Sequence, residues 1–308
     1  MLDGWSTPDL AHHVVLGYWL VCLVALGLSL VVPALGDMSR YGKIRASKPG
    51  KRGSAIVDWV VGLVVPKRWF SHFYIVGAAV NGALLVHLIL VWQFNEIFFV
   101  HSALKGDTVL GLFQFMPSGA EGSMVLVGCS LVEIHLIRRW MEQWFLFRPS
   151  LHAKMHLLGY LLGVSFYIFM PLSIVLSAPQ SDNAGRVWVF DHWHTVWHPG
   201  SLVGLVLFTV GFLAQHAAHR TLAGLRKSSA DSYSRPHGVM FETVSCPHYA
   251  AECVLYCGVA VMVPGWATVL VVVFSAANLG LTATRTWEWY RKMYHGYPVR
   301  WAMVPGVW

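Results

Sequence analysis

The sequence predicts an all-α, polytopic membrane protein with about seven transmembrane helices. Hydrophobic residues make up 56% of the 308-residue chain and charged residues only 12%, whereas soluble domains average about 45–50% apolar and about 25% charged residues. So little charge cannot cover a water-exposed surface of this size. The apolar residues also gather in long runs, and a membrane-spanning helix needs about 20 of them.

Seven apolar runs are predicted to cross the membrane. They are residues 14–35, 73–94, 124–140, 155–176, 196–213, 249–263 and 266–284. Pro264-Gly265 separates the last two, and such a pair inside an apolar run marks a turn, so two short tilted helices are expected there. The apolar segment 53–72 contains Asp58, Pro66 and two cations, and it is expected to be re-entrant or interfacial.

The basic residues predict how these spans are oriented. Arg and Lys are concentrated in the segments after the first, third and fifth spans and in the C-terminal tail, whereas the loops 101–122 and 178–195 carry one basic residue each. The positive-inside rule then places the N-terminus on the lumenal side and the C-terminus in the cytosol. The formal net charge of +7 is therefore a topology signal, and no nucleic-acid partner is expected.

The stretch SCPHYAAE, residues 245–252, lies where a polar loop enters the sixth span. Ser245 suits the N-cap of a helix and Pro247 suits its first turn. His248 and Glu252 are then four residues apart on one helix face. Ionisable groups at the entrance of a membrane span are costly and usually face a cavity or a partner. A His–Glu pair that satisfies itself at the membrane interface would give the same pattern.

Two further polar stretches lie on the predicted cytosolic side. Residues 215–238 are expected to form a loop, whose cations beside polar and aromatic side chains suit an anionic ligand such as a phosphate. In the third span, His135, Arg138, Arg139 and Glu142 form a single polar stripe at helical spacing. A solvated positive-inside loop and a helix end with snorkelling arginines would account for the same residues.

Several kinds of site are missing from the sequence. It contains no GxGxxG, GxxxxGK[ST], HExxH or GxSxG motif, so a nucleotide must be held in another way. The sixteen histidines never form HxxHH, and the His-rich stretch 192–198 falls in a predicted lumenal loop. The five cysteines have no zinc-ligand spacing. No metal site is therefore expected.

Several motifs resemble those of the steroid 5α-reductase family. In the C-terminal part they are LAGLRK, SY followed by RP, VSCPHYAAE and YRKMYHGYP. DMSRYGK, VPKRWFSHFY and RRWME are more similar to the polyprenol-reducing branch of that family than to the steroid enzymes. The resemblance covers about residues 38–75, 130–148 and 213–305. It implies one integral membrane reductase domain over residues 1–308, with a cofactor-binding region at about 213–305.

The resemblance also implies an oxidoreductase of CH–CH groups that takes a hydride from NADPH. The NADPH-binding positions of the family carry over to Arg139, Arg226, Tyr233, His248, Glu252 and Tyr290. Two more of these positions hold Gln215 and His219, where the steroid enzymes have an Asn and an Asp. The first change keeps polar character, and the second replaces an acid by a base, so some cofactor contacts are expected to differ.

The catalytic Glu and Tyr of the steroid enzymes are not matched, since the region of that Glu aligns near His72 and the Tyr position falls at about Leu136. A steroid substrate is therefore not expected. The resemblance implies instead reduction of the α-isoprene double bond of a long polyprenoid in the endoplasmic reticulum membrane, within the dolichol pathway that supports N-glycosylation.

Hydride addition needs an electron-poor alkene, which favours a conjugated aldehyde over an allylic alcohol. A donor near the carbonyl oxygen would stabilise the enolate-like transition state. His72, with Tyr74, is the predicted catalytic donor, and a histidine can also supply the proton.

Two other functions remain open from the sequence. Membrane isoprenylcysteine methyltransferases, which use S-adenosylmethionine, carry a His-Pro-x-Tyr segment before a late helical hairpin. Here the order is Pro-His-Tyr followed by Glu252, which favours the reductase. A lipid-binding or transport protein would more often show polar residues at mid-span or an inverted repeat. The expected partners are membrane lipids and the polyprenoid substrate, and no obligate protein partner is evident.

Overall fold

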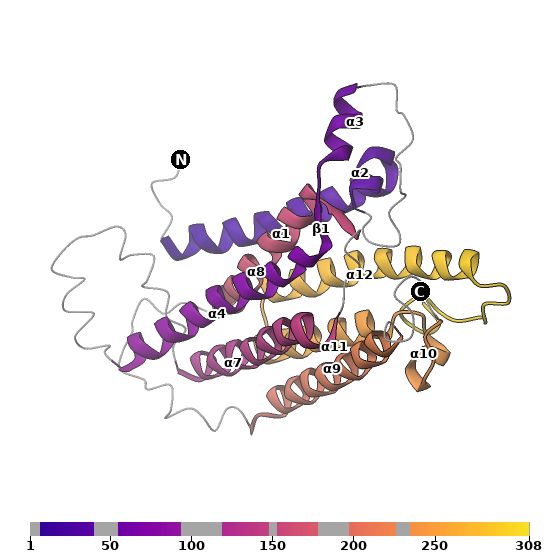
Figure 1. Ribbon diagram of the computed structural model, residues 1–308. Helices are drawn as coiled ribbons and strands as arrows, with labels where there is room; N and C mark the ends of the chain where they lie inside the picture. The colour runs from indigo at the N-terminus through magenta and orange to yellow at the C-terminus, as the bar shows by residue number, and fades with distance from the viewer. Residues whose placement is uncertain are drawn as a thin grey trace.

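The computed structural model describes residues 7–39, 55–93, 119–147, 153–177, 197–225 and 235–307. Long helices lie side by side in one bundle (Figure 1). They are α1 (Thr7–Val31), α4 (Phe70–Gln93), α7 (Gly119–Met141), α8 (Leu157–Ser177), α9 (Pro199–Gly224), α11 (Pro247–Met262) and α12 (Trp266–Met293). The predicted all-α architecture is therefore confirmed.

Within the described residues, five helices are long and apolar enough to cross a membrane, namely α1, α4, α8, α9 and α12. The chain is a multi-pass membrane protein. The third predicted span is helix α7, but Glu133, Arg138 and Arg139 make it more polar than the others. The sixth is α11, whose 16 residues reach roughly 24 Å at 1.5 Å per residue, less than the hydrocarbon thickness of about 30 Å. The count of seven crossings is not confirmed.

Shorter elements join the long helices. They are α2 (Pro33–Met38), α3 (Ala55–Gly62), the 3-10 turn η2 (Lys67–Trp69), the π-helical turn η3 (Glu142–Leu146) and α10 (Val239–Thr243). Strands β1 (Val64–Pro66) and β2 (Lys154–His156) pair antiparallel, with Val64 opposite His156. α3 projects from the bundle and exposes Ile56 and Trp59 (Figure 1). Between residues 55 and 69 the chain thus forms short elements and no spanning helix.

Two segments are more helical than the sequence indicated. The prediction of a loop from residue 215 was wrong for residues 215–224, which continue α9 to Gly224. The polar side chains of this stretch lie on one face, since Gln215 and His219 are buried while Arg220 is exposed. They mark a polar contact between helices rather than a loop. α12 likewise continues beyond residue 284 to Met293.

Glycines bring the backbones of α9 and α11 into contact. A Cβ atom on Gly211 would lie 2.5 Å from the carbonyl oxygen of Ala251, and a Cβ on Gly258 would lie 2.5 Å from the carbonyl oxygen of Gly204. Small residues allow such close approach of helices in membranes, where backbone packing drives association. The contact positions the site because Gln215 lies one turn after Gly211, and Glu252 follows Ala251.

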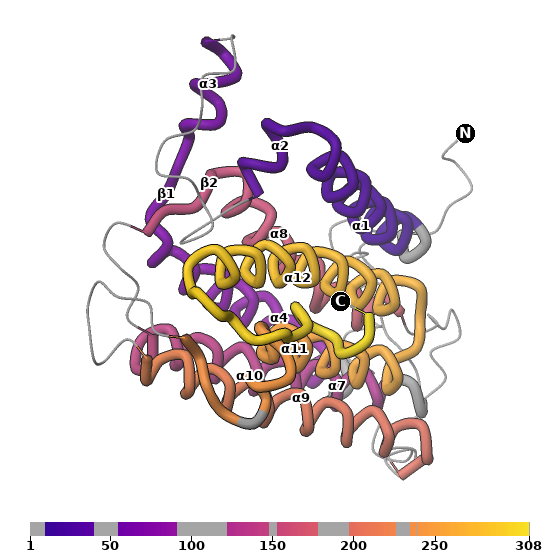
Figure 2. Tube along the Cα trace, turned by 90° about the vertical axis from the view of Figure 1, so that its right-hand side faces the viewer, coloured from indigo at the N-terminus to yellow at the C-terminus, as the bar shows by residue number. Residues whose placement is uncertain are grey.

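The C-terminal segment covers the start of α11. Figure 2 shows this segment crossing α11 beside α12. The backbone N–H groups of Ser245 and Cys246 donate to the carbonyl oxygens of Trp301 and Ala302, at 2.8 and 3.0 Å. These bonds fix the entry of α11, which carries His248 and Glu252.

We expect the Gly258→Ala variant to be clearly less stable than the wild type, with an apparent Tm lowered by several degrees. The added methyl group would meet backbone atoms of Gly204 and Phe208 at 2.5 Å, and overpacking of this kind costs about 1–3 kcal/mol. Gly27→Ala is the matched control, because a Cβ there has nothing within 4 Å. Thermal unfolding in detergent compares them, and equal Tm values would contradict the close contact.

Candidate functional site

Polar side chains of α4, α7, α9 and α11, four helices of the bundle in Figure 1, contact one another near the starts of α4 and α11 and the ends of α7 and α9. We call this group the polar cluster. Its members are Tyr74, His135, Arg138, Arg139, Glu142, Gln215, His219, His248 and Glu252.

Arg139 occupies the centre of one half of the polar cluster, and only 7% of its surface is exposed. Its guanidinium donates to the hydroxyl of Tyr74 at 2.7 Å and to the carboxylate of Glu142. Nδ1 of His219 lies 2.7 Å from the same guanidinium and 2.8 Å from the Glu142 carboxylate. One buried cation thus joins α4, α7 and α9.

Glu142 begins the π-helical turn η3, in which the N–H of Phe147 donates to the Glu142 carbonyl at 2.9 Å, five residues back. Such turns occur frequently at functional sites. The carboxylate also lies 2.7 Å from Nδ1 of His216. Burial alone would raise the pKa of Glu142, but the hydrogen bond from His219 and the charge of Arg139 hold this pKa well below its usual value. Glu142 is therefore ionised.

Arg138 organises the other half of the polar cluster. It donates to Nδ1 of His135 at 3.2 Å, to the side-chain oxygen of Gln215 and to the carbonyl oxygen of Phe212. Its guanidinium also lies 3.8 Å from the centre of the Phe212 ring. Gln215, which is fully buried, donates onward to Glu252 at 3.1 Å. This chain of contacts runs from α7 through α9 to α11.

The start of α11 faces this group of side chains. The rings of His248 and His219 are 5.6 Å apart, and Glu252 lies one turn further along the helix. The prediction that Ser245 caps α11 was wrong, because the N-cap residue is Cys246 and no side chain forms the capping hydrogen bond. The C-terminal segment binds the backbone at this point instead.

The structure brings six of the ten predicted site residues together: Tyr74, Arg139, Gln215, His219, His248 and Glu252. Two others contact different residues. His72 lies 3.0 Å from the Tyr160 hydroxyl, through its Nδ1, and the buried ring of Tyr290 stacks on Tyr297 with centroids 5.5 Å apart. Arg226 and Tyr233 lie outside the described residues.

The polar cluster contains residues that were not among the predicted site residues. His135, Arg138 and Glu142 belong to the polar stripe of the third run, which equally suited a snorkelling helix end. Tyr167 and Tyr256 are buried beside the cluster, with the Tyr167 ring 5.2 Å from Tyr74 and the Tyr256 ring 6.3 Å from His135. The sequence does place Tyr256 beside the face of α11 that carries Glu252, four residues earlier, whereas Tyr167 is a single tyrosine in an apolar run and gives no periodic signal.

Formal charges balance within the polar cluster, since it holds two arginines, Arg138 and Arg139, and two acidic residues, Glu142 and Glu252, and both arginines pair with Glu142. A buried and balanced set of donors and acceptors suits an uncharged polar group better than a phosphate, which needs excess positive charge. Within the described residues, no three His, Cys, Asp or Glu side chains are arranged to hold a metal ion.

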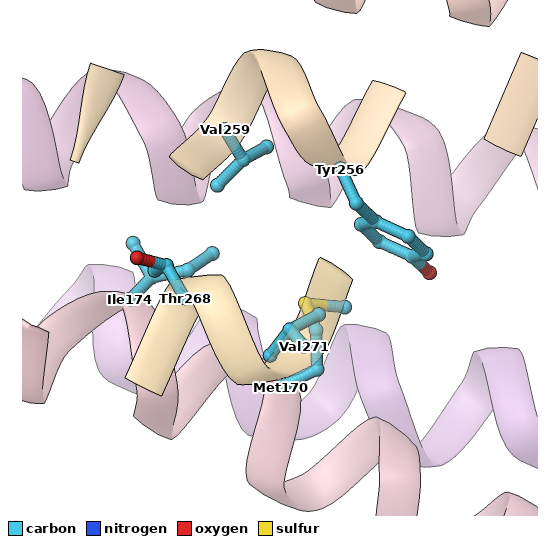
Figure 3. Close-up of a pocket in the computed structure, with 6 residues that line it drawn as sticks. All are labelled: Met170, Ile174, Tyr256, Val259, Thr268 and Val271. Atoms are coloured by element: carbon cyan, nitrogen blue, oxygen red, sulfur yellow. The ribbon is translucent and has the colours of Figure 1, made fainter. Parts of the chain in front are cut away.

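A small, mainly apolar cavity lies between α8, α11 and α12 (Figure 3). The residues that line it are Met170, Ile174, Tyr256, Val259, Thr268 and Val271. Tyr256 both borders this cavity and packs near His135, with ring centroids 6.3 Å apart. An apolar region of the bundle therefore adjoins the polar cluster.

Comparison with known proteins gives a consistent set of relatives. The family model described as 3-oxo-5-alpha-steroid 4-dehydrogenase matches residues 153–308. The chain is 30% identical to a polyprenal reductase of Xenopus tropicalis, over 98% of this chain and 97% of that protein. It is also 30% identical to polyprenal reductase 1 of Arabidopsis thaliana, over 94% and 96% of the two chains. The similarity to the two polyprenal reductases extends over nearly the whole chain.

We expect the Glu142→Gln variant to lose much of its stability at pH 7, because the substitution leaves the buried Arg139 cation without its carboxylate. Breaking one partner of a buried ion pair costs about 3–5 kcal/mol. Thermal unfolding in detergent measures the loss. Glu288→Gln, which changes an exposed carboxylate of α12, is the control and should unfold like the wild type.

The carboxylate of Glu142 should also make the stability of the protein depend on pH below neutrality. The pKa of Glu142 in the folded chain lies below the ordinary value of 4.5. Its ionic contacts therefore contribute their full stability above about pH 4.5, the pKa of an unperturbed glutamate. This contribution is lost as the pH falls from there toward the lower pKa of the folded state. Between pH 7 and pH 3, the Tm of Glu142→Gln should depend less on pH than the Tm of the wild type. An equal pH dependence of the two Tm values would show that Glu142 is not held ionised by its partners.

Proposed function

Because the chain belongs to the 3-oxo-5-alpha-steroid 4-dehydrogenase family, we propose that it reduces the α-isoprene double bond of a long-chain polyprenal with hydride from NADPH. The observation that carries the proposal is the buried polar cluster, in which six of the ten predicted site residues meet, five of them at predicted cofactor positions. Relatives described as polyprenal reductases align over nearly the full chain, which supports an aldehyde as the substrate.

The side chains of the polar cluster fit the nicotinamide end of a dinucleotide. Glu252 and Gln215 offer a carboxylate and an amide to a carboxamide group or a ribose, and His248 lies on the same face of α11. The Nε atom of Arg138 is buried, lies 3.7 Å from a carboxylate oxygen of Glu142 and forms no hydrogen bond to a described residue. The balanced charge of the cluster suits an uncharged carboxamide.

The phosphates of the cofactor need cations that the cluster does not have in excess. We assign them to the stretch after α9, where Arg226 follows the exposed Arg220, with Tyr233 and Tyr290 as further cofactor-binding residues. Tyr74, Arg138, Arg139 and Glu142 come from outside residues 213–305. The C-terminal region thus supplies all the predicted cofactor positions except Arg139, and α4 and α7 complete the site.

A reduced nicotinamide, when bound, supplies hydride to the β-carbon of the conjugated double bond. Negative charge then develops on the aldehyde oxygen, and the chain must stabilise it with hydrogen-bond donors held in place before the reaction. The α-carbon finally takes up a proton. An allylic alcohol has no carbonyl oxygen to accept this charge, which is why the aldehyde is the proposed substrate.

Tyr74 and His72 keep their proposed catalytic roles. The hydroxyl of Tyr74 accepts from Arg139 at 2.7 Å, so its own proton points away from the guanidinium, and we propose that it donates to a substrate oxygen. His72 is partly exposed and lies against Tyr160 at 3.0 Å. This position at the start of α4 suits a residue that takes a proton from water and passes it on.

The proposed cellular setting is the endoplasmic reticulum membrane, with the N-terminus lumenal and the C-terminus cytosolic. The starts of α4 and α11 and the ends of α7 and α9 then lie on the cytosolic side, where NADPH is available. The product would enter the dolichol pathway that supports protein N-glycosylation. The prenyl tail needs only an apolar environment, so membrane lipids and the substrate are the proposed partners.

The reaction is tested with protein purified in detergent with lipid. Polyprenal and polyprenol are supplied at equal concentrations, and NADPH oxidation is followed. We expect NADPH oxidation and a product two mass units heavier with polyprenal alone. Turnover of polyprenol alone would contradict the electron-poor-alkene argument. If neither reacts and NADPH does not bind, the reductase proposal fails, and binding of S-adenosylmethionine would then favour a methyltransferase.

Cofactor binding is tested separately with the Glu252→Gln variant. Loss of a hydrogen bond to a charged group costs about 1.5–3 kcal/mol, so we expect the Kd for NADPH to rise by about tenfold or more. Fluorescence or calorimetric titration in detergent measures it. Glu288→Gln is the matched control and should leave Kd unchanged. An unaltered Kd in Glu252→Gln would remove Glu252 from the cofactor site.

A further inference from the structure

His135 on α7 is a fully buried histidine with a defined hydrogen-bonding state. Its Nδ1 atom lies 3.2 Å from Nη2 of Arg138, and its side chain has no exposed surface. A guanidinium can only donate hydrogen bonds, so Nδ1 must act as the acceptor. The hydrogen of the neutral imidazole therefore resides on Nε2, which is left as a donor.

The Nε2 donor of His135 has no acceptor among the described residues. Leaving a buried donor unsatisfied costs about 1–3 kcal/mol, and such groups in native proteins call for an explanation. Two aromatic side chains pack against the ring. Phe212 and Tyr256 both meet it edge to face, with centroids at 6.4 and 6.3 Å, so a hydrogen bond made here would be strong.

His135 lies between the proposed nicotinamide end of the site and the apolar cavity. Through Arg138 it is connected to Gln215 and Glu252, where we place the nicotinamide end of the cofactor. Through Tyr256 it adjoins the apolar cavity between α8, α11 and α12 (Figure 3). An aldehyde group with an isoprenoid tail needs this combination of one polar donor and an apolar environment.

We propose that Nε2–H of His135 donates a hydrogen bond to the aldehyde oxygen of the substrate, an inference that rests on the proposed function. As hydride adds to the β-carbon, the π electrons move to form the Cα–C1 double bond, and negative charge develops on the aldehyde oxygen. His135 stabilises that charge and keeps its own proton. The enolate then collapses, its α-carbon takes a proton from a water-linked donor such as His72, and the saturated aldehyde results.

Arg138 acts as a positioning residue in this arrangement. Because the guanidinium donates to Nδ1, it fixes the imidazole in the tautomer that carries hydrogen on Nε2. His135 is thus a neutral electrophile that stabilises the oxyanion, rather than the acid that protonates carbon.

The test compares His135→Phe, which removes the donor at similar volume, with His135→Gln, which keeps an N–H donor. Turnover of polyprenal and the Kd for NADPH are measured for both. We expect kcat to fall about 10²–10³-fold in His135→Phe, as when one oxyanion donor is removed, with Kd nearly unchanged and with partial recovery in His135→Gln. His13→Leu, which alters an exposed histidine of α1, is the control.

A direct readout is the infrared carbonyl band of the bound product, the aldehyde whose α-isoprene double bond has been reduced. The band should lie at lower frequency in the wild type and in His135→Gln than in His135→Phe, because a hydrogen bond weakens the C=O bond. Two results in His135→Phe would overturn the role of His135 while leaving the proposed function intact, provided that the wild type reduces polyprenal. One is a carbonyl band at the wild-type frequency, and the other is a kcat within about threefold of the wild-type value. If the wild type binds NADPH but does not reduce polyprenal, the proposed function fails, and this inference falls with it. If His135→Phe does not fold, the bands of wild type and His135→Gln decide, and a wild-type band at the frequency of the free aldehyde overturns the inference.

Discussion

The buried contact between Arg139 and Glu142 is the interaction on which the rest of the site depends. A cation with 7% exposure in a membrane protein requires a carboxylate partner. Glu142 provides it from the π-helical turn that ends α7, and the same pair binds Tyr74 of α4 and His219 of α9. The polar cluster is thus built from helices that are otherwise held together by apolar packing and by glycine contacts.

The sequence contained most of the architecture but only part of the site. Long apolar runs and alternating basic loops predicted an all-α membrane protein because the bilayer restricts spanning structures so strongly. His248 and Glu252 were predicted to share one helix face, and they do. Gln215 and His219 were misplaced in a loop, because a polar helix end inside a membrane protein has the composition of a loop until its buried partners are known.

The remaining site residues could not be derived from the sequence for a physical reason. The stripe from His135 to Glu142 suited a snorkelling helix end equally well, and only the packing of α9 against α7 distinguishes these two possibilities. Tyr167 is a single hydroxyl in an apolar run, and it meets Tyr74 only because helices far apart in the chain pack together. The hydrogen-bond state of His135 likewise depends on where Arg138 donates, which spacing alone does not determine.

The central claim, conjugate reduction of an aldehyde at the polar cluster, is tested most directly by the fate of the transferred hydrogen. The purified protein is given polyprenal and NADPH labelled with deuterium at the reactive position of the nicotinamide, and the product is analysed by NMR and mass spectrometry. We predict one deuterium at the β-carbon, and deuterium at the α-carbon only when the solvent is D₂O. Label at the aldehyde carbon, or none in the product, would contradict the account.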